Sequence, residues 1–452
     1  MRDAIEAALQ GHQADYIELR IEDNAATRVM YRGRQLEDIG RTGNRGGSAR
    51  ALVNGGWGFI SFNDTDNLRT KVALAVAQAR LVGGEGSKLA PVPPAQATVT
   101  PTVKKDPRQV PLADKKRLLD EYNDIVLSAP NVQSSTIIYG DAHKHTVFAS
   151  TDGSYIDQQR VDVTLNVRAL ARKDGDVQQA GFSLGRLGDY SMVEGLHAEI
   201  RDHARRAGEL LAAPTVPGGE YTVVLDPILA GVFCHEAFGH LSESDFIYEN
   251  PQMQEVMVLG RQFGQKHLNI VDGAAIPGLR GSFGYDDEGT AAHRTDLIRE
   301  GVLVGRLHSR ETAARMGEQP TGNARAIDYR FPPIVRMTNT IIEAGDMSFE
   351  DMIADIKEGV YARNWYGGQT SMEMFTFSAG EAFMIRNGKV AELVRPVVLS
   401  GNVFSTLQNL DAVGNDLDIN QGGGCGKGGQ SPLPVSNGSP HIRIQHCLVG
   451  GR

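Results

Sequence analysis

Two stretches rich in proline and glycine divide this chain of 452 residues into three segments. One hydrophobic core seldom organises more than about 250–300 residues, so a chain of this length is expected to form several domains. The first boundary is KLAPVPPAQATVTPT and the second is APTVPGGE, both of which are typical of connectors. We therefore expect an N-terminal domain at residues 1–88, a central domain at 103–213 and a C-terminal domain at 217–452.

The hydrophobic pattern predicts an α+β fold. YIELRIED, SSTIIYGD and HTVFAS alternate as strands do, whereas apolar residues at helical spacing predict helices at residues 64–81, 112–127 and 192–211. The third segment has one early helix, followed by many short strand-like runs separated by Gly, Pro and Asn. We expect N-terminal α/β segments followed by a large, β-rich C-terminal domain that carries one metal-binding helix.

Composition excludes several classes of protein. The formal net charge is −9, which argues against nucleic-acid binding through the phosphate backbone. No apolar run approaches the roughly 20 residues of a membrane helix, and the charged N-terminus lacks the apolar centre of a secretory signal. Three cysteines are too few for a disulfide framework. A cytoplasmic protein without a membrane or nucleic-acid partner is expected.

The stretch YTVVLDPILAGVFCHEAFGH carries the most informative chemistry. Asp226 is a suitable N-cap and Pro227 a suitable first helical residue, so a helix should begin at Pro227. His235 and His240 can offer neutral imidazoles to zinc, and the carboxylate of Glu236 can take a proton from a water that the metal activates. Glu236 is therefore the predicted general base.

The spacing of the two histidines requires a distorted helix. At about 100° per residue, positions i and i+5 lie about 140° apart around a regular helix, too far to chelate one ion. A π-bulge, or unwinding at Gly239, would bring both rings onto one face. We expect such a distortion at Gly239.

Two histidines leave a catalytic zinc one protein ligand short. The candidates for the third ligand are Glu243 and Asp245 nearby, and His293, Cys425, His441, His446 and Cys447 farther along the chain. Cys425 is favoured because glycines surround it and because the neighbouring Lys427 favours a thiolate. Imidazole and thiolate ligands suit Zn²⁺ best, although iron or cobalt would also fit.

Several sequence blocks, taken in order, resemble the TldD/PmbA family and specifically its TldD branch. The blocks are GRQLEDI, GGWGF, HEAFGH, YDDEGT, TGNARA, RMTNT and CGKGGQ. The resemblance implies a metallopeptidase whose metal is held by His235, His240 and Cys425, with Glu236 as catalytic base. It also implies unfolded or flexible peptide substrates, cleaved in an enclosed cavity. The same resemblance implies a dimer, formed with a metal-less PmbA-like (TldE) paralogue or with itself. The family's older label, modulator of DNA gyrase, does not imply a DNA-binding site.

Two other functions fit the same residues. The first is a metal-dependent hydrolase that acts on a non-peptide amide, which only substrate profiling would separate from a peptidase. The second is a non-catalytic regulatory protein with a structural zinc. Structural sites have four protein ligands, so a fourth ligand such as Glu243 or Asp245 would favour this alternative.

Overall fold

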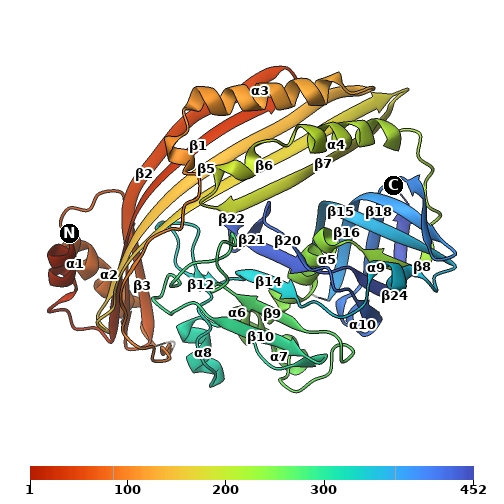
Figure 1. The fold of residues 1–452 in the computed structure, drawn as a ribbon. Coiled ribbons are helices and arrows are strands. Elements are labelled where there is room, and N and C mark those ends of the chain that lie inside the picture. Colours follow the sequence, from red (N-terminus) through yellow and green to blue (C-terminus); the bar gives the residue numbers. More distant parts are fainter. Residues whose placement is uncertain (85, 372, 452) are drawn as a thin grey trace.

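A long, curved sheet of seven strands dominates the computed structural model, which describes residues 1–84, 86–371 and 373–451 (Figure 1). The strand order is β3-β2-β1-β5-β6-β4, and β7 also pairs with β6. The strands are β1 (Tyr16–Arg32), β2 (Gln35–Val53), β3 (Gly56–Phe62), β4 (Gln96–Val99), β5 (Val132–Ser150), β6 (Tyr155–Lys173) and β7 (Asp176–Leu187). The first two segments of the sequence therefore share one sheet.

Several strands are longer than the sequence pattern predicted. SSTIIYGD and HTVFAS were expected as separate strands, but both belong to β5, which has 19 residues. The polar stretch between them, Asp141–His145, pairs with β1 on one side and with β6 on the other. Backbone pairing on both sides keeps this stretch extended where the apolar alternation fails.

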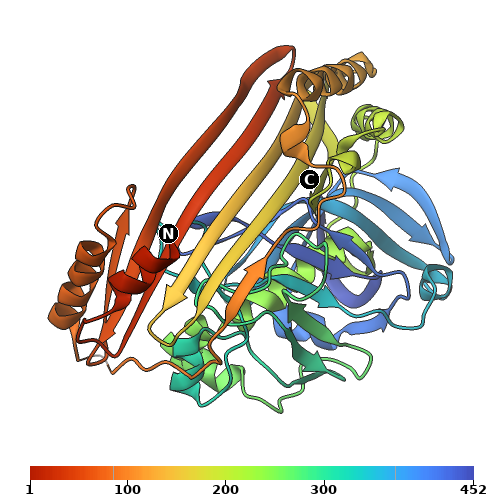
Figure 2. The same ribbon diagram turned by 60° about the vertical axis from the view of Figure 1, so that its left-hand side comes forward.

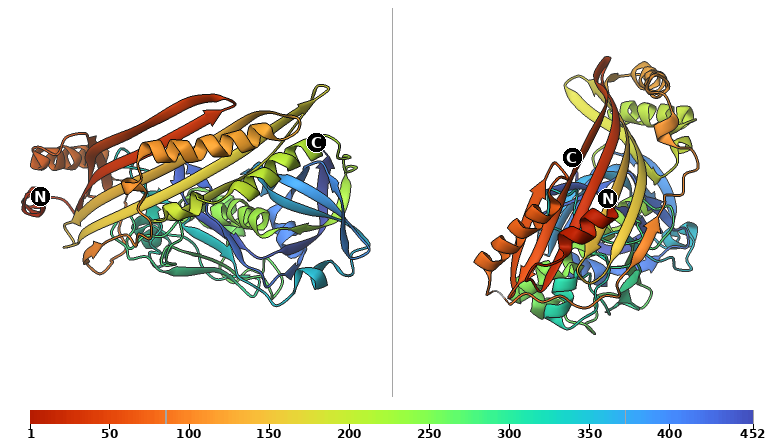
Figure 3. Two further views of the ribbon diagram at one scale, coloured as in Figure 1. Left: turned by 45° about the horizontal axis from the view of Figure 1, so that its top comes forward. Right: turned by 90° about the vertical axis from the view of Figure 1, so that its left-hand side faces the viewer.

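Four helices cover one face of the sheet, at the top and left in Figure 1 (see also Figures 2 and 3). They are α1 (Arg2–Leu9), α2 (Leu68–Val82), α3 (Leu112–Ser128) and α4 (His197–Leu210), with 3₁₀ turns η1 (Pro107–Gln109) and η2 (Tyr190–Val193). Leu19 and Val29 of β1 are an even number of positions apart, so their side chains point to the same face of the sheet. Leu19 packs in the core with α1 and α2, and Val29 packs in the core with α3 and α4. The predicted helix at 192–211 starts later, at His197, because η2 and a turn precede it.

The opposite face of the sheet carries charged residues that bind the C-terminal part of the chain. Arg20 of β1 forms an ion pair with Asp287 at 3.3 Å, and Arg50 of β2 pairs with Glu288. Asp162 of β6 pairs with Arg280 at 2.8 Å. These contacts are largely buried and fix the sheet to the loops of the C-terminal part.

The C-terminal part contains two larger sheets. One has the order β11-β10-β9-β14-β23-β20, and in the other the pairings β15-β8-β24-β18-β16-β15 close a ring. The first consists of β9 (Ile270–Gly273), β10 (Arg294–Arg299), β11 (Val302–Leu303), β14 (Asn339–Ile342), β20 (Asp418–Asn420) and β23 (Ser436–Ser439). The second consists of β8 (Gly219–Leu225), β15 (Glu358–Ser371), β16 (Met374–Arg386), β17 (Lys389–Val394), β18 (Val397–Asn402), β19 (Leu410–Val413) and β24 (Ile442–Gly451).

Two small hairpins and several short helices complete this part. The hairpins pair β12 (Ala324–Arg325) with β13 (Ile334–Val335), and β21 (Gly424–Lys427) with β22 (Gln430–Pro434). The helices are α5 (Pro227–Cys234), α6 (Ser244–Glu249), α7 (Pro251–Val256), α8 (Arg310–Met316), α9 (Phe349–Ile353) and α10 (Val403–Gln408). The α+β class and the β-rich C-terminal part are as predicted. Across the described ranges, no helix combines the length and the apolar character needed to span a membrane.

Replacing Asp162 with alanine should lower the free energy of unfolding by about 3–5 kcal/mol, because Arg280 would stay buried without a carboxylate. Urea denaturation of the purified variant measures this. The exposed pair Arg386–Glu392 provides the control, and Glu392→Ala should hardly change the denaturation midpoint. Equal effects of the two substitutions would contradict a structural role for the buried pair.

Candidate metal centre

The helix that carries the histidines begins as predicted. Asp226 caps α5 by accepting a hydrogen bond from the backbone N–H of Leu229 at 2.9 Å, and Pro227 is the first helical residue. The chain then continues as a π-helical turn, η3 (His235–Gly239), and a 3₁₀ turn, η4 (His240–Ser242). The predicted distortion up to Gly239 is confirmed. It places the rings of His235 and His240 with their centroids 5.2 Å apart.

Gly239 lets this turn lie against the residues that precede β14. A β-carbon at Gly239 would lie 2.1 Å from the sulfur of Met337, which is itself fully buried. A larger residue at this position would therefore push the π turn away from its support. The glycine is needed for close packing, since its backbone is right-handed and helical.

Cys425 reaches the histidines from the hairpin β21–β22, 185 positions along the chain from His240. The fully buried guanidinium of Arg336 holds this hairpin by donating to the carbonyl of Cys425 at 2.8 Å and to that of Gln430 at 3.1 Å. Arg280 donates to the carbonyls of Gln421 and Gly423 just before the hairpin. Two buried arginines thus fix the backbone on either side of the thiol.

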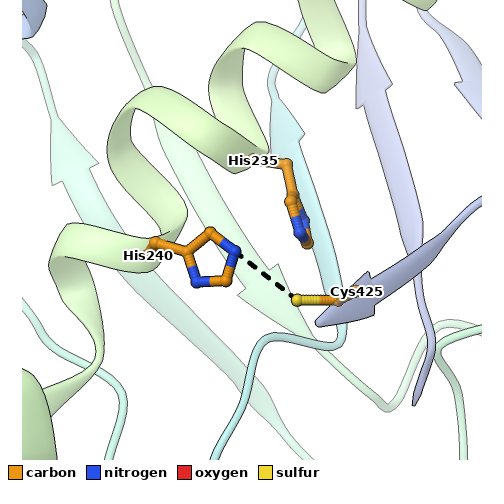
Figure 4. Close-up of side chains that lie close together, drawn as sticks. All are labelled: His235, His240 and Cys425. Atoms are coloured by element: carbon orange, nitrogen blue, oxygen red, sulfur yellow. Dashed lines mark hydrogen bonds between the residues drawn. The ribbon is translucent and has the colours of Figure 1, made fainter. Parts of the chain in front are cut away.

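Side-chain atoms of His235, His240 and Cys425 lie within 4.8 Å of one another (Figure 4). The sulfur of Cys425 is 3.5 Å from Nε2 of His240. Nδ1 of His235 is buried and has no hydrogen-bond partner in the described parts of the chain. Two imidazole nitrogens and one thiolate are a donor set that zinc prefers, so these residues fit a metal ion.

The charges in this group set the protonation of the ligands: they favour the thiolate that a metal requires, but they also hold a proton on His240 that a metal would have to displace. Burial alone would raise the pKa of the Cys425 thiol, but the charges and hydrogen bonds of His235 and His240 lower this pKa to about 4. Burial likewise opposes protonation of His240, yet Glu243 and Cys425 raise its pKa well above the ordinary value. The cysteine is therefore a thiolate at neutral pH, the form that a metal requires.

Glu243 was one candidate for the third ligand, but its carboxylate instead accepts a hydrogen bond from Nδ1 of His240 at 3.0 Å. The ammonium of Lys427 lies 3.0 Å from the same carboxylate and 2.6 Å from Asp245. Burial raises the pKa of Glu243, while Lys427 and His240 lower it to about 2. A carboxylate that accepts a hydrogen bond from Nδ1 fixes the orientation and the tautomer of the imidazole ring, and leaves Nε2 free for a metal.

The remaining candidates lie elsewhere. Asp245 binds Lys427 and the backbone N–H of Val335. His441 pairs with Asp416, His446 pairs with Glu220, and exposed His293 contacts a backbone carbonyl, while Cys447 is buried in β24. Among these and the other described residues, only His235, His240 and Cys425 form a group that could hold a metal ion.

A cavity of about 380 Å³ opens beside this group. Its walls include β6 and β7 of the long sheet, α4, α5 and β15, and both His235 and Glu236 border it. Oε2 of Glu236 is 3.9 Å from Nε2 of His240. The carboxylate of Glu236 thus lies close to a candidate ligand and beside a space that could admit a substrate.

The ionisation of Cys425 gives a direct test of these charges. In the metal-free protein we expect the absorbance of a thiolate at 240 nm to persist down to a midpoint near pH 4. Burial raises the pKa of Cys447 to about 12 and raises that of Cys234 still further, so neither should contribute at neutral pH. Cys425→Ser serves as the blank. A step at pH 8–9 would instead show an ordinary thiol.

Exchanging Glu243 for glutamine is expected to weaken zinc binding by roughly 10- to 100-fold, because His240 loses its anionic partner. Competition with a chelating dye measures the affinity. Glu249→Gln, on the exposed side of α6, is the matched control and should bind zinc as the native protein does. Unchanged affinity in a folded Glu243→Gln protein would rule out this support.

Comparison with known proteins identifies the class. Residues 218–451 match the PmbA/TldA metallopeptidase C-terminal domain, residues 105–213 the central domain and residues 17–79 domain 1. The chain therefore belongs to the PmbA/TldD family of metallopeptidases, as its sequence blocks indicated.

Curated relatives carry matching names. A metalloprotease of Synechocystis sp. is 48% identical over 441 residues, which are 97% of this chain and 95% of the relative. A zinc metalloprotease TldD homolog of Saccharolobus solfataricus is 30% identical over 414 residues, which are 90% of each chain. Both likenesses extend over nine-tenths or more of this chain.

Solved structures share the fold at lower identity. A Thermotoga maritima protein described as a modulator of a DNA gyrase has a TM-score of 0.80 at 19% identity, over 99% of each chain. TldE from Thermococcus kodakarensis has a TM-score of 0.77 at 16% identity, over the whole of each chain. These two likenesses concern the fold alone.

Proposed function

We propose that this protein is a zinc-dependent metallopeptidase of the HExxxH…C type that hydrolyses unfolded or flexible peptides. His235, His240 and Cys425 would hold the metal, and Glu236 would act as general base. The observation that carries the proposal is the convergence of three ligand side chains next to a cavity that Glu236 also borders. The name of the Saccharolobus relative supports zinc, and iron or cobalt would suit the same donors.

A bound zinc ion, Glu236 and Glu243 would have separate roles in the proposed reaction. A bound zinc ion would supply Lewis acidity, which lowers the pKa of a water molecule and polarises the scissile carbonyl. Glu236 is close enough to the ligand group to take a proton from the attacking water and to return it to the leaving amine. Glu243 keeps the proton of His240 on Nδ1, so that Nε2 stays directed at the site.

The number of ligands separates a catalytic site from a structural one. Structural zinc sites have four protein ligands, whereas catalytic sites have three and an open position. Within the described residues the candidate group has three members. The nearest further acid, Glu243, is engaged by His240 and Lys427, which favours catalysis over a purely structural zinc.

An extended peptide suits the cavity. β7 forms part of its wall, and among the described strands β7 pairs only with β6, so an added strand would pair along the other edge of β7. Strand addition reads the peptide backbone and tolerates varied side chains. Folded substrates cannot present a free strand, so a preference for folded over unfolded proteins would contradict this mode of binding.

We further propose a cytoplasmic dimer. The partner would be a metal-less PmbA/TldE-like paralogue or a second copy of the chain. The likeness of the fold to TldE of Thermococcus kodakarensis supports the paralogue, because two subunits of one fold can pair through equivalent surfaces.

The decisive experiment compares metal content and cleavage of an unstructured fluorogenic peptide in three proteins. Native protein should contain about one zinc per chain and cleave the peptide. Glu236→Gln should keep the metal and lose at least about 100-fold in rate, the usual contribution of general base catalysis. Cys425→Ser should lose most of its metal, because one of three ligands is gone. The exposed Glu255→Gln is the control and should behave as native protein does.

Each alternative gives its own outcome. Zinc without cleavage of any unfolded peptide, but with turnover of simple amides, would indicate a non-peptide hydrolase. Zinc without any hydrolysis would indicate a structural site. Full activity in Glu236→Gln would show that another group is the base.

A further inference from the structure

Asn437 on β23 borders the cavity that also contains His235 and Glu236. Its backbone is fixed on both sides, by pairing with Thr340 of β14 and with Asn420 of β20. α5 packs directly on this strand, where a β-carbon at Gly231 would lie 3.0 Å from the Asn437 carbonyl. The position of Asn437 relative to the metal-binding helix is therefore rigid.

Asn437 lines this cavity, as does Val435 two residues earlier. Ser436 faces the other way, where its hydroxyl accepts a hydrogen bond from the backbone N–H of Arg280 at 2.9 Å. Asn437 thus belongs to the same cavity wall as His235 and Glu236.

This carboxamide has no internal partner. Asn437 is only 8% exposed and its Oδ1 is buried, yet its side chain makes no hydrogen bond with any residue in the described ranges. Buried polar groups are normally satisfied, so each exception calls for an explanation, such as a catalytic role or a bound water or ion. Another buried asparagine, Asn339, shows the normal situation: its amide accepts from Gly281 and donates to Gly273 and Ser282.

We propose that Asn437 binds the main chain of the peptide substrate beside the scissile bond. A peptide group offers one N–H and one C=O. The carboxamide of Asn437, which no hydrogen bond from a described residue holds, can turn to present the complementary acceptor or donor. Such a contact would orient the scissile carbonyl between the metal ligands and Glu236, whatever the neighbouring side chains of the substrate. The inference rests on the proposed peptidase function and adds a substrate-binding residue to it.

The test uses two variants, Asn437→Ala and Asn437→Asp, the second of which keeps an acceptor but loses the donor. Both should lower kcat/KM by roughly 10- to 100-fold, about tenfold for each hydrogen bond lost. The loss should be similar for unfolded peptides of different sequence. Zinc content should not change. Binding of an unstructured peptide to Glu236→Gln, followed by fluorescence anisotropy, should weaken when Asn437→Ala is added.

Stability separates a substrate contact from a structural role. Asn437→Ala removes no internal hydrogen bond, so its Tm should match or exceed that of the native protein. Asn339→Ala is the control and should lower Tm, since it breaks three hydrogen bonds with described residues. Unchanged kcat/KM and peptide affinity in Asn437→Ala would overturn the inference, as would a Tm loss that accounts for the activity loss. If native protein cleaves no peptide, the proposed function itself has failed.

Discussion

A thiolate stays buried only where positive charge faces it, and the centre of this protein is organised around that requirement. Cys425, His240, Glu243 and Lys427 form a row in which negative and positive charges alternate. Each group stabilises the charged form of the next, as the shifted pKa values of Cys425, His240 and Glu243 indicate. The row also joins two segments far apart in the sequence, and so the metal ligands meet only in the folded chain.

Much of the remaining structure serves to bring the hairpin of Cys425 to the histidine-bearing helix. Arg336, from the block RMTNT, holds the hairpin through its carbonyls. Asp287 and Glu288, from YDDEGT, bind the long sheet, and Arg280 links Asp162 of that sheet to the loop before Cys425. The sequence blocks that mark the family therefore include residues that take no part in the proposed reaction. These residues position the candidate metal ligands.

The features predicted successfully from sequence are those set by neighbouring residues. The cap at Asp226, the start at Pro227 and the distorted turn follow from local rules of helix geometry. Cys425 was favoured because glycines surround it. The ion pair of Glu243 with Lys427, and the absence of a hydrogen-bond partner for the Asn437 side chain among the described residues, depend on contacts between distant segments, which no local pattern encodes. The continuity of β5 was missed for the same reason.

The π-helical turn accommodates one residue more than a regular helix would. Because this wider turn already places His240 on the same face as His235, deleting one residue between Glu236 and His240 would close it into a regular α-helical turn with the shorter histidine spacing. The chain that follows would keep its orientation, and with it the contact between Glu243 and Lys427. A single-residue insertion or deletion therefore separates this site from the more compact helical zinc motif.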